Sequence, residues 1–135
     1  MYSDYNTMSD YKFKRFTKIG SKLGNYSISL TGSHSFGFSS GFYNREGISR
    51  YNKVVLFYDK SRKAVGFQFT NDKDAEGAFT IIHGNKRTTG SVTVRSFLIS
   101  NEINKEEYVG RKTPTKVKDG EFGEIFVIDL LENNK

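Results

Sequence analysis

Cations interleaved with aromatic residues form the group whose types and spacing most clearly suggest chemistry in this chain. The segment YKFKRF, residues 11–16, alternates aromatic rings with basic side chains. Five cations fall within eleven residues there: Lys12, Lys14, Arg15, Lys18 and Lys22. Such cations can follow a phosphate backbone while exposed rings stack on bases, but the same alternation is typical of a half-buried strand. The segment therefore predicts either a nucleic-acid contact or an ordinary basic strand.

Residues suited to catalysis or metal binding are few. The chain has no cysteine, and His34 and His83 stand in no spacing that indicates a metal site or a catalytic triad. The acidic pairs Glu106–Glu107 and Glu121/Glu124 are typical of a solvated surface. The glycine-containing loops match neither a phosphate-binding loop nor a dinucleotide fingerprint. We therefore expect a protein that is not an enzyme and needs no cofactor and no metal.

Charge is distributed unevenly along the chain, whose formal net charge is +6. Residues 11–63 hold eleven basic residues and two acidic ones, whereas residues 119–135 hold five acidic residues and one lysine. A molecule of this kind attracts polyanions at long range. This pattern favours a nucleic-acid partner, with an acidic protein as the alternative. The cations Lys60, Arg62 and Lys63 are instead typical of a hairpin tip whose charge prevents strand edges from aggregating.

An internal repeat organises the elements that position these residues. Residues 26–69 read as two short strands around a glycine-containing loop, an amphipathic stretch and a hairpin, and residues 78–130 repeat that order. A repeat of this length indicates duplication within one chain. We expect a mostly-β fold with two short helices, one at residues 39–46 and one starting near residue 95. Residues 1–25 would form a basic leader with one strand, and residues 26–135 a single barrel domain.

The two units resemble the swapped-hairpin barrels of the AbrB and MazE type, whose pattern is a strand, a short helix, a Gly-Ile pair and a hairpin. The matching positions are Phe36, Phe38, Phe42, Gly47, Ile48 and Val54 in the first unit, and Val92, Val94, Leu98 and Ile103 in the second. The chain departs from the family pattern at Ser39 and Arg95, where a proline is usual, and at Tyr51-Asn52, where Gly-Asp is usual. The resemblance implies an internally duplicated swapped-hairpin or double-psi-like β-barrel, formed by two tandem copies in one chain.

The resemblance also implies DNA binding, as a transcription regulator or an antitoxin-like repressor. In that family, basic residues on the first strand and on the loop after it lie against the DNA. By position this selects Lys86 and Arg87 in the loop HGNKRTTG, with Arg95 just beyond it. The corresponding loop of the first unit, TGSH, holds no cation, so the leader cations would supply the charge there. We expect double-stranded DNA ahead of single-stranded DNA or RNA.

Two other functions stay open. One is a protein-binding module, such as a phage-type inhibitor or a complex subunit, and the other is a single-stranded nucleic-acid binder. No apolar run reaches the roughly 18 residues that a membrane span needs, and the first residues lack the apolar core of a signal peptide. We therefore expect a cytoplasmic protein without membrane contact, either a monomer with internal pseudo-symmetry or a homodimer.

Overall fold

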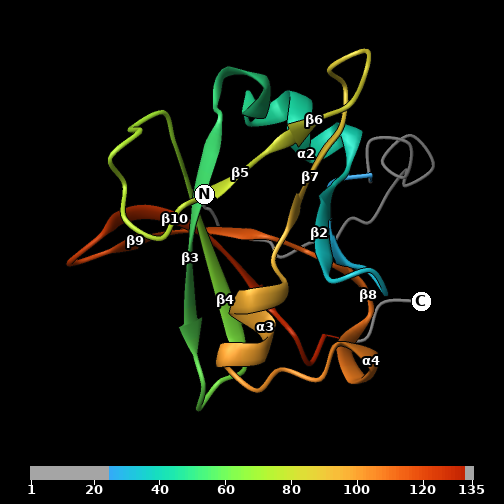
Figure 1. Ribbon diagram of the computed structural model, residues 1–135, viewed down its shortest axis with the longest axis vertical. Coiled ribbons are helices and arrows are strands. Elements are labelled where there is room, and N and C mark those ends of the chain that lie inside the picture. Colours follow the sequence, from blue (N-terminus) through green and yellow to red (C-terminus); the bar gives the residue numbers. More distant parts are fainter. Residues whose placement is uncertain (1–24, 133–135) are drawn as a thin grey trace, which may run out of the picture.

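Strands dominate the part of the chain that the computed structural model describes, residues 25–132. The strands are β1 (Ile28–Leu30), β2 (Ser35–Phe38), β3 (Lys53–Asp59), β4 (Ala64–Thr70), β5 (Phe79–Thr80), β6 (Ile82–His83), β7 (Gly90–Thr93), β8 (Gly110–Lys112), β9 (Thr115–Asp119) and β10 (Gly123–Asp129). The helical segments are α2 (Ser40–Arg45), the 3-10 segment η1 (Ile48–Arg50), α3 (Arg95–Ser100) and α4 (Lys105–Tyr108). The predicted mostly-β fold is confirmed (Figure 1).

The strands form two antiparallel five-stranded sheets. The first, which we call sheet A, has the order β6-β7-β2-β1-β8, and the second, sheet B, has the order β5-β3-β4-β10-β9. Each sheet is held together at its centre by a ladder between the two halves of the chain, β2 with β7 in sheet A and β4 with β10 in sheet B. Neither half of the chain therefore makes a sheet alone. Residues 71–78, where the two predicted units meet, form a loop between β4 and β5.

The described strands do not form the one closed barrel that we expected. The ladders stop at two points where the chain passes from one sheet to the other, at Ile81 between β5 and β6 and at residues 113–114 between β8 and β9. Pro114 has no N–H with which to continue a ladder. The N–H of Ile81 donates to the carbonyl of Asn52 at 2.9 Å, outside sheet A. Because of these two breaks, the ten strands form two sheets rather than one continuous sheet.

The core lies between the two sheets and is rich in aromatic rings. Phe36 and Phe38 on β2 and Phe67 on β4 are at most 2% exposed. The rings of Phe36 and Phe67 meet edge to face, with their centroids 5.0 Å apart. Phe42 of α2 is fully buried and packs on Phe38 of sheet A and on Phe126 of sheet B. Because aromatic side chains bury large apolar areas, this cluster fixes α2 against both sheets.

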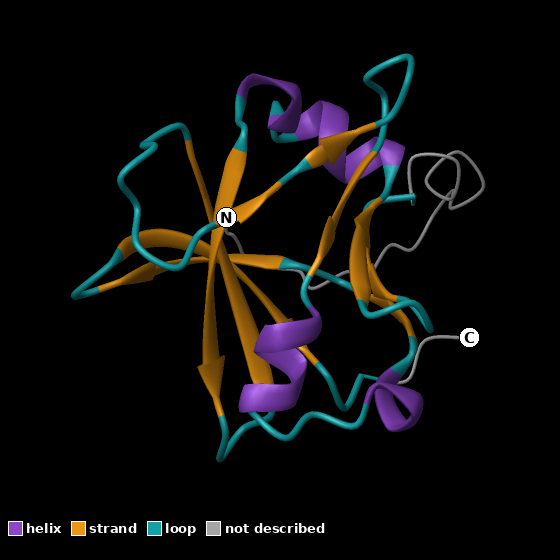
Figure 2. Cartoon of the chain, viewed as in Figure 1, coloured by secondary structure: helices purple, strands orange, loops and turns teal. Residues whose placement is uncertain are grey.

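The helices are short, and their ends follow from local chemistry. Ser39 caps α2, because its Oγ accepts a hydrogen bond from the N–H of Phe42 at 3.3 Å. Gly47, with φ at +66°, lets the chain turn from α2 into η1. Figure 2 shows α2 and η1 at one end of the molecule and α3 toward the other, with strands between them. The two predicted helices are confirmed as α2 and α3, whereas α4, capped by Asn104, was not predicted.

The hairpins follow the sequence pattern closely. The apolar runs on either side of residues 60–63 form β3 and β4, paired from Lys53↔Thr70 to Asp59↔Ala64. Residues 115–129 form the second predicted hairpin, β9 with β10. The strand predicted at residues 11–16 lies outside the described residues. No helix within residues 25–132 is long and apolar enough to cross a membrane.

Candidate functional site

The structure separates the three cations that the sequence selected in the second unit. Lys86 and Arg87 are exposed in the loop between β6 and β7, whereas Arg95 begins α3 at the other end of β7. The four residues of β7 alone span roughly 13 Å. The other predicted contact residues lie outside the described part of the chain: Lys12, Lys14, Arg15, Lys18 and Lys22.

Arg95 lies beside a different loop, that of the first unit. The backbone N–H of Val94 donates to the carbonyl of His34 at 2.8 Å, which brings the start of α3 against residues 31–34. Desolvation of the His34 ring lowers its pKa, and the positive charges of Lys105 and Arg95 lower it further. This end of the molecule therefore carries a small cationic group of its own, apart from Lys86 and Arg87.

The β6–β7 loop is fixed to η1. Arg87 has a left-handed backbone, with φ at +51°, and its Nη2 donates to the carbonyl of Ser49 at 2.6 Å. The loop is also closed internally, since the N–H of Gly84 donates to the carbonyl of Thr89 at 2.9 Å. A guanidinium has five N–H donors, so this one bond leaves Arg87 further donors for a ligand. The anchor places Arg87 against η1, whose last residue is Arg50.

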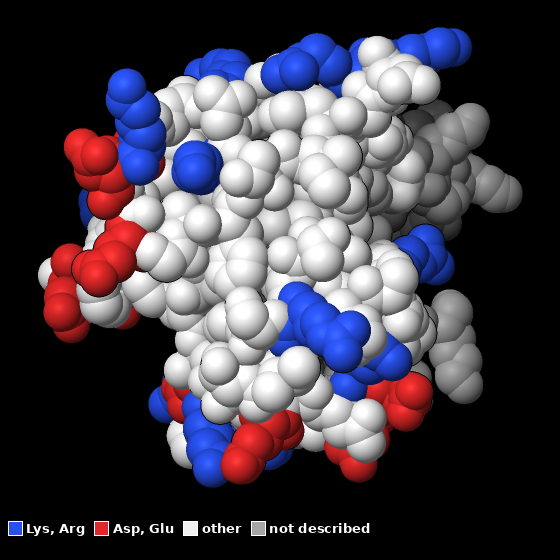
Figure 3. Space-filling model, in the orientation of Figure 1, with Lys and Arg blue, Asp and Glu red and all other residues white. Residues whose placement is uncertain are grey.

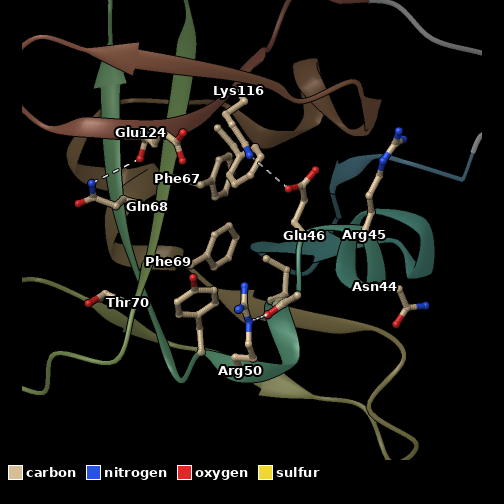
Figure 4. A pocket seen from close by; sticks show the side chains of 14 residues that line it. Asn44, Arg45, Glu46, Arg50, Phe67, Gln68, Phe69, Thr70, Lys116 and Glu124 are labelled. Atoms are coloured by element: carbon tan, nitrogen blue, oxygen red, sulfur yellow. Dashed lines mark hydrogen bonds and ion pairs between the residues drawn. The ribbon is translucent and has the colours of Figure 1, made fainter.

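A pocket of about 660 Å³ opens beside η1, between α2–η1 and strands β4, β9 and β10. We call it the basic pocket. It is lined by Asn44, Arg45, Glu46, Gly47, Ile48, Arg50, Tyr51, Phe67, Gln68, Phe69, Thr70, Lys116, Glu124 and Phe126. Its lining thus combines three cations with two carboxylates and four aromatic rings. In Figure 4, Lys116 and Glu46 point toward each other across the pocket, and Arg45 points outward to the rim.

Each cation of the basic pocket lies over an aromatic ring. The Arg50 Cζ atom is 5.3 Å from the ring centroid of Tyr51, and the Lys116 Nζ atom is 5.5 Å from that of Phe126. At the rim, the Arg45 Cζ atom is 5.2 Å from the ring of Tyr26. Such contacts stabilise by about 0.5–1 kcal/mol at exposed sites. They hold the positive charges in place at the pocket before any ligand arrives.

Glu46 lines the pocket and contacts both Tyr26 and Lys116. Its Oε2 accepts a hydrogen bond from the hydroxyl of Tyr26 at 2.7 Å, and its Oε1 lies 3.7 Å from Lys116 Nζ. Burial, the hydrogen bond to Glu46 and the charge of that carboxylate raise the pKa of Tyr26 to about 12. Tyr26 therefore stays protonated and keeps donating near neutral pH. Through these two contacts Glu46 positions Tyr26 and Lys116.

A buried hydrogen-bonded chain joins α2, β6 and the segment after η1. The fully buried Tyr43 contacts His83 Nδ1 through its hydroxyl at 2.7 Å, and His83 Nε2 lies 2.8 Å from the carbonyl of Tyr51. A carbonyl only accepts, so we assign the proton of neutral His83 to Nε2 and let Nδ1 accept from Tyr43. His83 therefore has a structural role here, and it fixes the backbone of Tyr51 at the pocket.

Basic and acidic side chains are distributed unevenly over the surface. Figure 3 shows Lys and Arg side chains along the upper rim, where Figure 1 places α2, η1 and the β6–β7 loop. Acidic side chains lie on the left, where the β4–β5 loop holds Asp72, Asp74 and Glu76, and also along the lower edge, beside Lys and Arg side chains. Among residues 25–132, no three His, Asp or Glu side chains are grouped so that they could hold a metal ion.

Comparisons of the chain with protein-family models, curated proteins and solved structures found no match. The resemblance to the AbrB and MazE type therefore stays a prediction from the sequence pattern.

Sequence reasoning missed three cations that the structure places at the pocket: Arg45, Arg50 and Lys116. A local signal existed for two of them, because Arg45 and Arg50 flank the Gly47-Ile48 pair. Lys116 could be found only through strand register, since it lies opposite Phe126 in the β9–β10 hairpin. Phe126 in turn packs on Phe42 of α2, which carries Lys116 to the same site.

Proposed function

We propose that this chain is a non-catalytic nucleic-acid-binding protein whose contact surface is the basic pocket together with the β6–β7 loop. The observation that carries the proposal is the bond from Arg87 to the carbonyl of Ser49. It holds the loop against η1, whose Arg50 lines the pocket, and on this ground we group five cations with the aromatic-lined hollow as one surface. The five are Arg45, Arg50, Lys86, Arg87 and Lys116.

The composition of this surface suits a nucleic acid better than a simple anion. Cations supply phosphate contacts, and aromatic rings supply faces on which unpaired bases stack. Phe69, Phe126 and Tyr51 line the pocket, which at about 660 Å³ lies within the usual size range of small-molecule sites. A duplex keeps its bases stacked internally, so this hollow favours a single strand. Double-stranded DNA remains the form that the family resemblance favours.

Internal duplication is part of the proposal, and strand pairing supports it. When β1, β2, β3 and β4 are exchanged for β5–β6, β7, β8–β9 and β10, every pairing between strands becomes another observed pairing. The ladders β1–β2 and β6–β7 exchange, as do β3–β4 and β9–β10, while β2–β7 and β4–β10 map onto themselves. Both breaks fall in the second copy, where Ile81 interrupts the counterpart of β1 and Pro114 the counterpart of β3. This pattern fits two tandem copies of a swapped-hairpin unit.

The test is fluorescence anisotropy with labelled single-stranded and double-stranded oligonucleotides over a salt series. The site variant is Arg50→Ala with Lys86→Ala, and its matched control is Lys60→Ala with Arg62→Ala at the β3–β4 turn. Each removes one exposed lysine and one exposed arginine. For a single strand, losing two phosphate contacts flattens the slope of log K against log salt by about 1.4.

We expect wild-type binding that weakens steeply with salt, a flatter slope in the site variant and an unchanged slope in the control. Tighter binding of the single strand would match the pocket, and tighter binding of the duplex would match the family resemblance. Absence of binding at low salt would refute the proposal. Equal loss in both variants would also refute it, because binding would then follow net charge alone.

A further inference from the structure

The basic pocket is lined by two carboxylates, of which one is engaged and the other is free. Glu46 accepts a hydrogen bond and lies 3.7 Å from Lys116 Nζ. The carboxylate of Glu124 makes no hydrogen bond or ion pair with any residue that the structure describes. Gln68 Nε2 donates at 3.5 Å to the backbone carbonyl of Glu124, not to its side chain. Lys118 stands opposite Glu124 in the β9–β10 register, yet these two described side chains form no ion pair.

Glu124 and Arg50 stand on opposite sides of the aromatic rings of the pocket. Side chains alternate across a strand, so Glu124 lies on the same face of β10 as Phe126, which also lines the pocket. Figure 4 shows the rings of Phe67 and Phe69 between Glu124 and Arg50. The pocket thus has an exposed cation on one side, aromatic rings in the middle and a free carboxylate on the other side.

This arrangement matches the parts of a nucleotide. A phosphate is attracted to the Arg50 side and repelled by the carboxylate of Glu124. A base can stack on the half-buried ring of Phe69. An ionised carboxylate accepts hydrogen bonds and donates none, so the base has to present donors toward Glu124. The pocket therefore favours a base whose edge carries donors.

Guanine is the base that meets this requirement. Its N1–H and N2–H₂ groups are neighbouring donors, and together they can reach both oxygens of one carboxylate. Adenine and cytosine place an acceptor nitrogen beside their amino group, and thymine places its single N–H between two carbonyls. In each of these three bases the carboxylate meets an acceptor as well as a donor, which weakens the contact.

We propose that the basic pocket selects guanine in a single strand, with Glu124 as the residue that contacts the edge of the base. This inference rests on the proposed nucleic-acid-binding function and adds the base that the site prefers. The two oxygens of Glu124 accept from N1–H and N2–H₂, while Arg50 contacts a neighbouring phosphate. A bidentate contact of this kind favours the right base by about tenfold. The loop cations Lys86 and Arg87 contact phosphates of any sequence.

Fluorescence anisotropy at low salt tests the preference with labelled abasic strands of about ten residues that carry one base at the centre. The abasic background keeps the phosphates and removes competing bases. The central base is guanine, hypoxanthine, adenine or cytosine. Hypoxanthine is guanine without the 2-amino group, so it removes one donor and keeps the ring. We expect guanine to bind about tenfold more tightly than adenine, and hypoxanthine to lose most of that gain.

The site variant is Glu124→Ala, which removes both acceptor oxygens. Its matched control is Glu121→Ala at the β9–β10 turn, which removes the same charge from an exposed glutamate outside the pocket lining. We expect the guanine preference to disappear in Glu124→Ala and to persist in Glu121→Ala. Both variants should bind the abasic strand at least as tightly as wild type, because each loses a negative charge. Circular dichroism checks folding, and Glu124→Thr, which suits a strand, replaces Glu124→Ala if that variant does not fold.

Equal binding of the four central bases by wild type would overturn the guanine inference and leave nucleic-acid binding in place. A guanine preference that survives in folded Glu124→Ala would overturn it as well, because another group would then contact the base. Equal loss of the preference in Glu121→Ala would contradict the assignment to Glu124. If no strand binds even at low salt, the proposed function fails and the guanine inference fails with it.

Discussion

Replacing Tyr43 by phenylalanine tests the buried chain that holds the basic pocket together. The Tyr43 ring is fully buried, and its hydroxyl donates to His83 Nδ1 at 2.7 Å. His83 in turn donates to the backbone of Tyr51, whose ring lies under Arg50. Tyr43→Phe removes one hydroxyl and keeps the ring, so it opens no large cavity. The variant thus isolates the hydrogen bond.

The expected loss in the free energy of unfolding depends on the acceptor that Tyr43→Phe leaves without a donor. One hydrogen bond contributes about 1 kcal/mol net, and a buried acceptor left without a donor costs about 1–3 kcal/mol. Since water can reach the half-buried His83 ring in part, we expect a loss of about 2 kcal/mol in the free energy of unfolding. With a urea m-value of about 2 kcal/mol/M, the unfolding midpoint should fall by about 1 M.

The assay is equilibrium unfolding in urea followed by circular dichroism. Tyr58→Phe is the control, because Tyr58 is half-buried and the described residues offer its hydroxyl no hydrogen bond. We expect a shift below about 0.3 M there. If Tyr43→Phe and Tyr58→Phe shift the midpoint equally, the Tyr43–His83–Tyr51 chain contributes nothing specific and the reasoning fails.

Three further predictions concern stability. The pKa of Tyr26 is raised to about 12, so the folded state keeps a proton that an unfolded tyrosine releases near pH 10, and stability falls as pH rises through that window. The free energy of unfolding, measured in urea at about pH 9 and pH 11, should therefore fall by about 1 kcal/mol less in Tyr26→Phe than in wild type, after allowance for solvent screening. Gly41→Ala should cost about 1–3 kcal/mol in thermal unfolding because its Cβ would overlap the Asn25 carbonyl, whereas Gly37→Ala meets no atom within 4 Å and should not. Lys63→Gly should stabilise by about 0.5 kcal/mol because Lys63 has φ at +55°, and a loss of stability would contradict that account.

Local patterns in the sequence predicted the elements well. Alternating apolar residues on both sides of residues 60–63 specify the β3–β4 hairpin, and the Ser39 cap with Gly47 specifies α2. The four-residue α4 was not predicted because a single turn of helix has no apolar periodicity. Its only signal in the sequence is the cap at Asn104. The barrel prediction failed at residues 81 and 113–114, where strand continuity depends on tertiary contacts and on a single proline.

The site was predictable only in its local part. Lys86 and Arg87 follow from the loop sequence, but the bond that joins them to Ser49 crosses 38 residues of chain. Arg95 was grouped with them because it is close in sequence, and β7 separates them in space. Lys116 depends on a strand register that only the packing of Phe126 against α2 decides. The sequence shows the types of these residues, but it does not show which of them lie close together in the folded chain.

Because the two halves of the chain are interleaved in both sheets, the order of synthesis constrains folding. β2 is completed on one side only by β7, and β4 only by β10. A nascent first half would therefore present four unpaired strand edges, on β1, β2, β3 and β4, and the apolar faces of Phe36 and Phe67 until the second half is synthesised. Pairs so distant in sequence make folding slow. The period before release is when this chain is most exposed to aggregation and to chaperones.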